Sequence, residues 1–524
     1  MASDLSPPSE TVTVIVDGKE HRFAKGMNLL EACQSVGAKI PFFCYHPGLS
    51  SPAVCRQCLV EIKGAPKPVP SCYTTVADKM EVTTNSPKVL DIRRQMLEFT
   101  LLGHPVDCPI CDKAGECSLQ RHYFDWDGKL ARNEGVKIRK AKVVDIGKHI
   151  VLDQERCILC TRCIRVCDEI AKSPDLTMAH RGAHQVLTTA PGQRLDNPYS
   201  LNTVDVCPVG ALTAKDFRFA RRAWELDAIP SICPGCATGC NIEVHSSRGK
   251  IYRLVPRENP AVNKFWMCDE GRFEYKAVHE NRLLFPAIGG RRSKFDAAVA
   301  EAARLLRLAL VKDAGSVGVA FSFAATNEDT HALVRLVNEG LKVERVYAAG
   351  KAAGWSDDIL VSADKNPNRA GVEHMVSLPL RNLKDLASDL ASGAVSALVL
   401  LGSESAALAF DKLSALVVLG SHKGPAGAAA HVVLPVCTWA EVDGTFTNKN
   451  GRVQRIHAAL PAPGEARPAW QVVAALASRL GADLAFTSAE QVFAEAARHH
   501  AFLKGADWGP RALPVQLRFG ESRG

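Results

Sequence analysis

Several features that mark other classes of protein are missing or scarce in this sequence of 524 residues. The N-terminus has no basic region followed by an apolar one, so we expect no secretory signal. No run of eighteen apolar residues occurs, and the sequence therefore predicts no direct membrane insertion. Aromatic residues make up 6% of the chain and the net charge is only +8, so no nucleic-acid partner is expected. No G-x-G-x-x-G motif follows a predicted strand, which argues against a dinucleotide site.

Cysteine, in contrast, is abundant and unevenly distributed. Of the 18 cysteines, all except Cys437 lie before residue 269. Without export a disulfide framework is not expected, and reduced thiolates bound to metal are the natural alternative. The first half of the chain is therefore predicted to carry the chemistry.

The stretch Cys157–Cys167 has the spacing C-x2-C-x2-C-x3-C. Three thiolates on one short loop can surround a 4Fe–4S cluster, as in the bacterial ferredoxin run, whose fourth ligand comes from elsewhere. A structural zinc site is the alternative, but three cysteines so close together would crowd a tetrahedral ion. Cys207, which precedes a proline, is favoured as fourth ligand over Cys167, which precedes an aspartate. This third set of predicted ligands comprises Cys157, Cys160, Cys163 and Cys207.

The N-terminal segment predicts a β-grasp ferredoxin domain. Residues 11–23 alternate around a turn at Asp17-Gly18, as in a hairpin, and residues 29–36 form a short helix closed by glycine. Cys33 in that helix is expected in the core. A long loop and a strand at residues 59–62 follow, with cysteines at C-x10-C-x2-C-x13-C, enough for one 2Fe–2S cluster. This first set comprises Cys44, Cys55, Cys58 and Cys72.

An amphipathic helix is predicted from Pro87 to about Leu102. The motif H-x3-C-x2-C-x5-C follows it. A histidine after a helix is more often a cap or a core residue, but a cubane needs four ligands and this segment has no spare cysteine. A neutral imidazole ligand should raise the reduction potential of a 4Fe–4S cluster. This second set comprises His104, Cys108, Cys111 and Cys117.

A fourth set has the spacing C-x2-C-x3-C-x27-C and comprises Cys233, Cys236, Cys240 and Cys268. Short strands are predicted between its members, at residues 242–245 and 250–255. The densest basic stretch, Lys137–Lys142, is predicted to be the solvated face of another strand. Together the four sets predict one 2Fe–2S cluster and three 4Fe–4S clusters, with Cys33, Cys167 and Cys437 left over.

Beyond the cysteine-rich half, apolar runs at residues 317–323, 397–401, 415–419 and 432–434 alternate with predicted helices near 293–310, 328–341 and 467–480. That alternation predicts a doubly wound α/β domain with a parallel sheet.

The order of the four motifs resembles that of the large iron–sulfur subunit of NADH:quinone oxidoreductase, respiratory complex I, a family that includes the mitochondrial 75 kDa subunit. The resemblance covers about residues 10–285. It implies that the first three sets lie in the electron path and that Cys207 completes the third. It also implies that the fourth set holds an additional cluster, off this path, that only some bacterial members keep.

The resemblance implies an α/β multidomain chain with five domains. They are a β-grasp 2Fe–2S ferredoxin domain (10–85), a His/Cys3 4Fe–4S domain (86–130), a 4Fe–4S ferredoxin-like domain (131–225), a 4Fe–4S domain of molybdopterin-oxidoreductase type (226–285) and a molybdopterin-oxidoreductase-like α/β domain (286–524). The last is expected to be a truncated relic. Its segment Glu441–Arg452 resembles a loop that borders the pterin, but Cys437 stands in the wrong context for a molybdenum ligand. No molybdopterin and no catalytic residue are therefore expected.

The function implied by the resemblance is electron relay from a flavin- and NADH-binding subunit towards a quinone-proximal iron–sulfur subunit. The chain would be peripheral, through the complex, on the cytoplasmic side of the inner membrane. An electron-relay subunit of an NAD-linked hydrogenase or formate dehydrogenase is the alternative. A hydrogenase would need further cysteine motifs after Cys268, and a formate dehydrogenase a molybdenum ligand. A non-redox scaffold is a third interpretation, but four clusters in one chain make sense only as an electron path.

Overall fold

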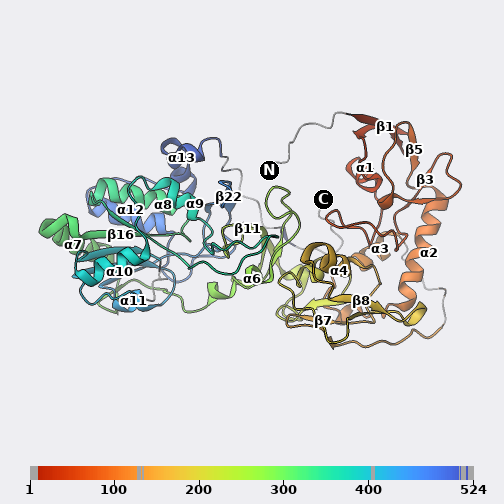
Figure 1. Ribbon diagram of the computed structural model, residues 1–524, viewed down its shortest axis with the longest axis horizontal. Helices are drawn as coiled ribbons and strands as arrows, with labels where there is room; N and C mark the ends of the chain where they lie inside the picture. The colour runs from red at the N-terminus through yellow and green to blue at the C-terminus, as the bar shows by residue number, and fades with distance from the viewer. Residues whose placement is uncertain are drawn as a thin grey trace. The chain divides into compact units, whose positions relative to one another are not determined.

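The structure is a computed structural model that describes residues 10–126, 132, 135–402, 408–506, 508 and 515–516. These residues form two compact units (Figure 1). The first unit contains the described residues up to Glu225, and the second runs from Leu226 to Gln516. None of the helices in the described ranges combines the length and hydropathy needed to cross a bilayer.

The first unit opens with a β-grasp sheet in the order β2-β1-β5-β3-β4. Its elements are β1 (Thr11–Val16), β2 (Lys19–Ala24), α1 (Leu29–Ser35), β3 (Leu59–Ile62), β4 (Val69–Pro70) and β5 (Met80–Thr83). Asp17 and Gly18 turn the β1–β2 hairpin with φ angles of 47° and 82°. The predicted hairpin, helix and strand are confirmed. Cys33 is fully buried among the apolar side chains between α1 and the sheet.

Two helices follow, α2 (Pro87–Gly103) and α3 (Ser118–Trp126). The Ser86 hydroxyl accepts a hydrogen bond from the Val89 backbone N–H at 3.2 Å, and Pro87 occupies the first turn, where its missing N–H costs nothing. The predicted amphipathic helix is confirmed. It ends at His104, which it delivers to the second set.

The rest of the first unit has little regular structure. It contains β6 (Val144–Asp145), β7 (Ile150–Leu152), α4 (Arg162–Arg165), a π-helix (Val166–Ala171), β8 (Leu176–Ala179), β9 (Val186–Thr189), α5 (Asn202–Asp205) and β10 (Leu212–Ala214). Strands β10, β7 and β6 form one sheet in that order, and β8 and β9 form a hairpin.

The strand predicted at Lys137–Lys142 is wrong, because these residues have no strand conformation. Lys137 and Lys140 bind carbonyl oxygens, and Lys142 pairs with the carboxylates of Asp107 and Glu155. The Lys137 ammonium donates to the Leu101 carbonyl at 2.7 Å and also to that of His104, and the Lys140 ammonium donates to the Gln185 carbonyl at 2.7 Å. The alternation of basic and apolar residues did not indicate a strand here, because the side chains of the segment bind neighbouring loops and its backbone pairs with none of the described strands.

The second unit begins with an antiparallel sheet in the order β13-β12-β11-β23. Its strands are β11 (Asp227–Ile232), β12 (Asn241–Ser247), β13 (Lys250–Pro256) and β23 (Val515–Gln516), and a short helix α6 (Asp269–Arg272) follows β13. The two strands predicted within 242–255 are confirmed. The fourth set lies at the ends of these elements.

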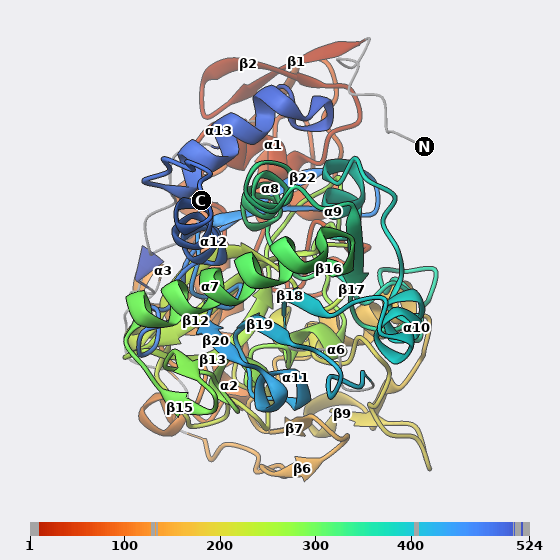
Figure 2. The ribbon, with the colours of Figure 1, turned by 90° about the vertical axis from the view of Figure 1, so that its left-hand side faces the viewer.

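The larger sheet of the second unit has seven strands in the order β15-β14-β20-β19-β18-β16-β17. The strands are β14 (Ala287–Ile288), β15 (Arg291–Arg292), β16 (Val317–Ser322), β17 (Arg345–Ala349), β18 (Ala397–Leu401), β19 (Ala415–Gly420) and β20 (Val432–Pro435). Strands β17, β16, β18, β19 and β20 pair in parallel and lie side by side in Figure 2. All four predicted apolar runs are strands of this sheet.

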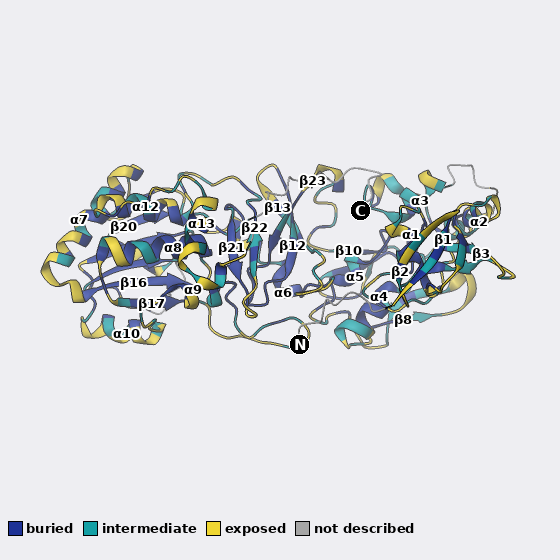
Figure 3. Ribbon diagram, turned by 90° about the horizontal axis from the view of Figure 1, so that it is seen from above, coloured by how far each residue is buried: buried dark blue, intermediate teal, exposed yellow. Residues whose placement is uncertain are grey.

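Helices cover both faces of that sheet (Figure 1). Apolar side chains of α7 (Phe295–Asp313), α8 (Asn327–Arg335), α12 (Ala469–Arg479) and α13 (Ala489–His499) pack on one face. Those of α10 (Leu383–Ser392) and α11 (Pro425–Ala429) pack on the other. The remaining elements are a π-helix (Leu336–Leu341), α9 (Arg369–Met375) and the hairpin β21 (Gly444–Thr447)–β22 (Val453–Ile456). Figure 3 shows the strands buried and the outer helix faces exposed, and the predicted doubly wound α/β domain is confirmed.

Candidate metal centres

The four thiols of the first set lie in one hydrogen-bonded group. Cys44 exchanges hydrogen bonds with Cys55 and Cys72, and Cys58 with Cys72. These bonds lower the pKa of Cys44 and Cys58 and raise that of the partner thiols. The Phe43 backbone N–H also points at Cys55 Sγ, at 3.4 Å. The four sulfurs therefore lie within hydrogen-bonding reach of one another, as donors to one cluster must.

In the second set, His104 is 8% exposed and burial lowers its pKa to about 4, so the imidazole is neutral at pH 7. Its Nδ1 is buried and, among the described residues, no hydrogen-bond partner reaches it. The ring also hydrogen-bonds the backbone of Arg156. A neutral ring with one oriented contact and one open nitrogen is what a metal-ligating histidine presents.

Two of the three cysteines of the second set share a cavity with that histidine. His104, Cys108 and Cys117 line one cavity of about 520 Å³ between α2 and α3. Cys111 faces Gly210, where a Cβ atom would overlap Cys111 Sγ. Burial raises the pKa of all three thiols, that of Cys117 to about 12. A ligand that stabilises thiolates is therefore needed if these sulfurs are to act as donors at neutral pH.

All four members of the third set line one small cavity. The backbone wraps around it through left-handed conformations at Leu159 and Thr161, with φ of 54° and 63°. Cys167 does not line this cavity. It is fully buried and its thiol hydrogen-bonds Asn197. The geometry thus brings Cys207, and not Cys167, to the other three cysteines.

The fourth set lies in the second unit at the turn between β11 and β12 and at the start of α6. The Cys233 backbone N–H donates to the Cys240 carbonyl at 2.8 Å, and the Gly271 N–H points at Cys268 Sγ at 3.4 Å. A Cβ on Gly271 would lie 2.9 Å from Cys233 Sγ, so only glycine leaves these sulfurs room. Burial and the neighbouring cysteines raise the pKa of Cys233 and Cys240 well above the usual thiol range.

The donor chemistry of the four sets fits iron–sulfur clusters. Fifteen thiols, all free, gather in groups of three or four in buried cradles, and the second group adds one histidine with an open nitrogen. Within the described residues, no three His, Cys, Asp or Glu side chains are arranged around one point to hold a single metal ion. A cluster needs no such point, because its several irons share the ligands.

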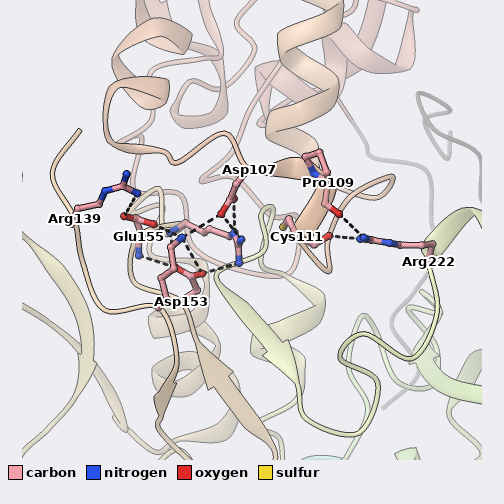
Figure 4. Close-up of polar contacts among 9 residues, drawn as sticks. Asp107, Pro109, Cys111, Arg139, Asp153, Glu155 and Arg222 are labelled. Atoms are coloured by element: carbon pink, nitrogen blue, oxygen red, sulfur yellow. Dashed lines mark hydrogen bonds and ion pairs between the residues drawn. The ribbon is translucent and has the colours of Figure 1, made fainter. Parts of the chain in front are cut away.

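Buried arginines connect the loops of the first unit. Arg156, which precedes Cys157, donates to both carboxylate oxygens of Asp107, at 3.1 and 2.7 Å, and to Asp153 at 2.8 Å (Figure 4). Asp107 precedes Cys108, so this ion pair joins the loops of the second and third sets. Figure 4 also shows Arg222 binding the carbonyls of Pro109 and Cys111.

On the other side of the third set, Arg162 and Arg165 donate to carbonyls of the first-set loop. The third-set loop therefore contacts the loops of both other sets. Sequence reasoning missed the roles of Arg156, Arg162 and Arg165, as well as those of Gly210 and Gly271. The available signal was their position, since each lies within a few residues of a predicted ligand.

The second unit contains a cavity of about 400 Å³ at the carboxyl ends of its parallel strands. Ser322 at the end of β16, Gly402 after β18 and Cys437 after β20 all line it. Strands β16 and β18 are neighbours from which the chain runs in opposite directions across the sheet, which is where doubly wound folds bind ligands. Burial, helped by Glu441 and Asp329, raises the pKa of Cys437 to about 12, so its thiol is protonated at neutral pH.

Five protein-family models match the chain. They are a 2Fe-2S iron-sulfur cluster binding domain (residues 9–87), the NADH-ubiquinone oxidoreductase-G iron-sulfur binding region (93–126), the ferredoxin-like domain of NADH-quinone oxidoreductase subunit 3 (147–213), the molybdopterin oxidoreductase Fe4S4 domain (226–280) and molybdopterin oxidoreductase (275–479). Both 2Fe-2S and 4Fe-4S domain families are thus present, together with a molybdopterin-oxidoreductase-like domain.

Curated relatives agree with these matches. The NADH-quinone oxidoreductase G subunit of Streptomyces coelicolor is 36% identical over 66% of this chain and 42% of its own length. The mitochondrial NADH dehydrogenase [ubiquinone] iron-sulfur protein 1 of Solanum tuberosum is 36% identical over 70% and 50%. The NADH-ubiquinone oxidoreductase 75 kDa subunit of Reclinomonas americana is 42% identical over 53% and 40%. The chain thus spans half or less of the length of these relatives.

Among solved structures, one chain of an NAD⁺-reducing [NiFe]-hydrogenase in the H₂-reduced state is 27% identical over 40% of this chain and 91% of its own. Its TM-score of 0.37 is too low to support an argument.

Proposed function

Because this chain resembles the large iron–sulfur subunits of NADH:quinone oxidoreductases over most of its length, we propose that it is an electron-relay subunit of such a complex. Electrons would arrive from a flavin- and NADH-binding subunit and leave towards quinone. In this proposal the chain has no substrate-binding catalytic site of its own.

One observation carries the proposal, namely that the loop of the third set contacts the loops of the first and the second. Arg165 reaches the Cys44 carbonyl on one side, and Arg156 reaches Asp107 on the other. An electron relay requires donor sets that adjoin one another. Metal sites that only hold the fold together have no such requirement.

We assign the ligands as the four sets defined above. The first holds one 2Fe–2S cluster, and the second, third and fourth each hold one 4Fe–4S cluster, with His104 and Cys207 as members. When bound, such clusters supply one-electron carriers. The residues of this chain contribute thiolate and imidazole donors, backbone N–H groups aimed at sulfur and glycines that leave room for the cluster.

We propose that the α/β domain of the second unit is a relic of a molybdopterin oxidoreductase and binds no molybdopterin. The sequence context of Cys437 supports this, because it does not match that of a molybdenum ligand and no other cysteine follows Cys268. Glu441, at the start of the pterin-loop-like segment, is engaged elsewhere, in a buried ion pair with Arg282 at 2.5 and 2.7 Å.

The partners that we propose are the flavin- and NADH-binding subunit and a quinone-proximal iron–sulfur subunit. The relatives are named as subunits of NADH-quinone and NADH-ubiquinone oxidoreductases, which supports assembly into a complex. We place the chain on the cytoplasmic side of the inner membrane, attached through that complex.

Metal analysis of the anaerobically purified chain tests the proposal. Clusters of two and four irons predict about 14 irons per chain, with matching sulfide and neither zinc nor molybdenum. Zinc in place of iron would overturn the cluster assignment. One molybdenum per chain would contradict the proposal that the second unit binds no molybdopterin. Full iron content without NADH-to-quinone electron transfer in the assembled complex would overturn the relay.

A further inference from the structure

Arg162 and Arg165 lie within the third-set stretch, and both are nearly buried, at 9% and 8% exposed. Arg165 donates from Nη1 to the Ser50 carbonyl and from Nη2 to the Cys44 carbonyl. Arg162 donates from Nη2 to the Tyr45 carbonyl, and its guanidinium lies 5.7 Å from the centre of the Phe42 ring. Both side chains therefore hold the loop that carries the first-set residue Cys44.

The same guanidiniums also bind the third-set loop. Arg162 Nη1 donates to the Val206 carbonyl at 3.2 Å, next to Cys207. Arg165 Nη2 donates to the Cys160 carbonyl at 3.5 Å. Each arginine thus makes hydrogen bonds to two cysteine-bearing loops that are more than one hundred residues apart in the sequence.

The charge of these two side chains is only partly compensated. Their hydrogen bonds end on carbonyl oxygens and on the Thr161 hydroxyl, which carry no full charge, and the Glu169 carboxylate lies near Arg165 alone. Burying a guanidinium without a counter-charge is costly. A cluster held by four thiolates is itself anionic, and one on each side would supply that counter-charge.

We propose that Arg162 and Arg165 are positioning residues that clamp the first-set loop against the third-set loop and raise the reduction potential of both clusters. This inference rests on the proposed function. Each cluster gains one electron, and one negative charge, from its donor on reduction. A fixed positive charge beside it favours that reduced form. Placing the charge between the two sets affects both potentials together.

Arg156 provides an internal contrast. It joins the second and third loops but is paired with two carboxylates, Asp107 and Asp153. These carboxylates neutralise its positive charge. Arg156 therefore fixes the spacing of those loops but exerts little net electric field on the clusters. The two junctions therefore differ in charge, and only the junction made by Arg162 and Arg165 should shift potentials strongly.

The test uses Arg162→Gln and Arg165→Gln in the assembled complex, with both cluster signals followed in redox titrations by electron paramagnetic resonance. Each variant should lower the reduction potentials of both the 2Fe–2S cluster and the third-set cluster. The expected change is about tenfold in the equilibrium constant for reduction, which is about 59 mV for one electron. Arg→Lys at either position keeps the charge and should restore most of the potential. It should not restore full stability, because lysine cannot make the forked hydrogen bonds.

Arg93→Gln is the matched control. Arg93 is 1% exposed and donates to the Leu59 carbonyl at 3.0 Å, next to the first-set residue Cys58. Its loss should move the 2Fe–2S potential alone. If Arg162→Gln and Arg165→Gln also move only one potential, or lower the yield of complex without moving either, the inference is overturned.

Glu169→Gln keeps the test decisive if the glutamine variants fail to assemble. Glu169 accepts from the backbone N–H of Ser50 at 2.9 Å and lies near Arg165. Removing its negative charge should raise both potentials, and unchanged or lowered potentials would contradict the inference. Failure of the proposed function itself has a different signature, since the wild-type complex would then lack the two cluster signals.

Discussion

The two units of this chain are held together in different ways. In the second unit, apolar side chains cover both faces of a parallel sheet, and strands β16, β18 and β19 are buried along their whole length. In the first unit, the three ligand sets lie mainly on loops, and the buried side chains include Arg93, Arg156, Arg162 and Arg165. We therefore expect the second unit to fold on its apolar core and the first unit to depend on its proposed clusters to bring its buried charges and thiols together.

Removing the clusters should show this difference most strongly. Chelating the iron from the full chain should abolish amide-exchange protection across most of residues 10–225, because structural metal sites contribute on the order of 10 kcal/mol to folding. The sheet of the second unit should stay protected. Hydrogen exchange read by mass spectrometry measures both regions in one sample. Equal loss in the two units would refute the contrast.

A single ligand of the first unit should have a nearly equal effect. We expect Cys207→Ala to abolish the third-set signal and to stop NADH-to-quinone electron transfer in the complex. The control is Cys167→Ala, which removes a buried thiol that is hydrogen-bonded to Asn197 and should cost about 1 kcal/mol with little loss of rate. The opposite pattern would make Cys167 the fourth ligand.

In the second unit, loss of a ligand should reduce assembly more than rate. Cys236→Ala removes one donor of the fourth set, which pins the β11–β12 turn to α6 across a long gap in sequence. We predict a lower yield of intact complex but a NADH-to-quinone rate, normalised to bound flavin, close to wild type. A normal yield with a collapsed normalised rate would place the fourth cluster in the electron path.

These expectations also show which parts could be predicted from sequence. The strands β16, β18 and β19 were predictable because continuous apolar runs are a strong signal for strands buried on both faces. The spacing of Cys157, Cys160 and Cys163 also predicted their gathering around one cavity. The contacts of Lys137 and Lys140 were not predictable, since their partners are carbonyls of distant loops. The roles of Arg156, Arg162 and Arg165 were equally hidden, because only the folded chain shows which loops each side chain joins.

His104 offers a change that should alter potential more than stability. We predict that His104→Cys keeps the second cluster and lowers its potential on the order of 100 mV, because a thiolate adds negative charge where imidazole is neutral. His104→Ala should weaken or lose that cluster alone. Redox titration with iron analysis distinguishes the two variants. Unchanged spectra in both variants would mean that His104 caps the end of α2 and is not a cluster ligand.

The smallest effect expected is one of stability alone, at a buried carboxyl in the second unit. Glu328 is fully buried in α8, and its carboxyl accepts hydrogen bonds from the Thr445 N–H at 2.8 Å and hydroxyl at 2.7 Å. Burial raises its pKa from 4.5 to about 7. Since the folded form holds the proton more tightly, its stabilising contribution is complete below pH 4.5 and is lost as the pH rises to about 7.

Glu328→Gln should therefore flatten the pH dependence of unfolding of the second unit between pH 4.5 and 7, where the wild type loses up to about 3 kcal/mol. Thermal unfolding of the full chain, followed by a probe of the second unit, measures this slope. Glu490→Gln, at an exposed position in the first turn of α13, is the control and should leave the slope unchanged. Cluster potentials should not move in either variant. A wild-type slope in Glu328→Gln would mean that another group titrates in this range.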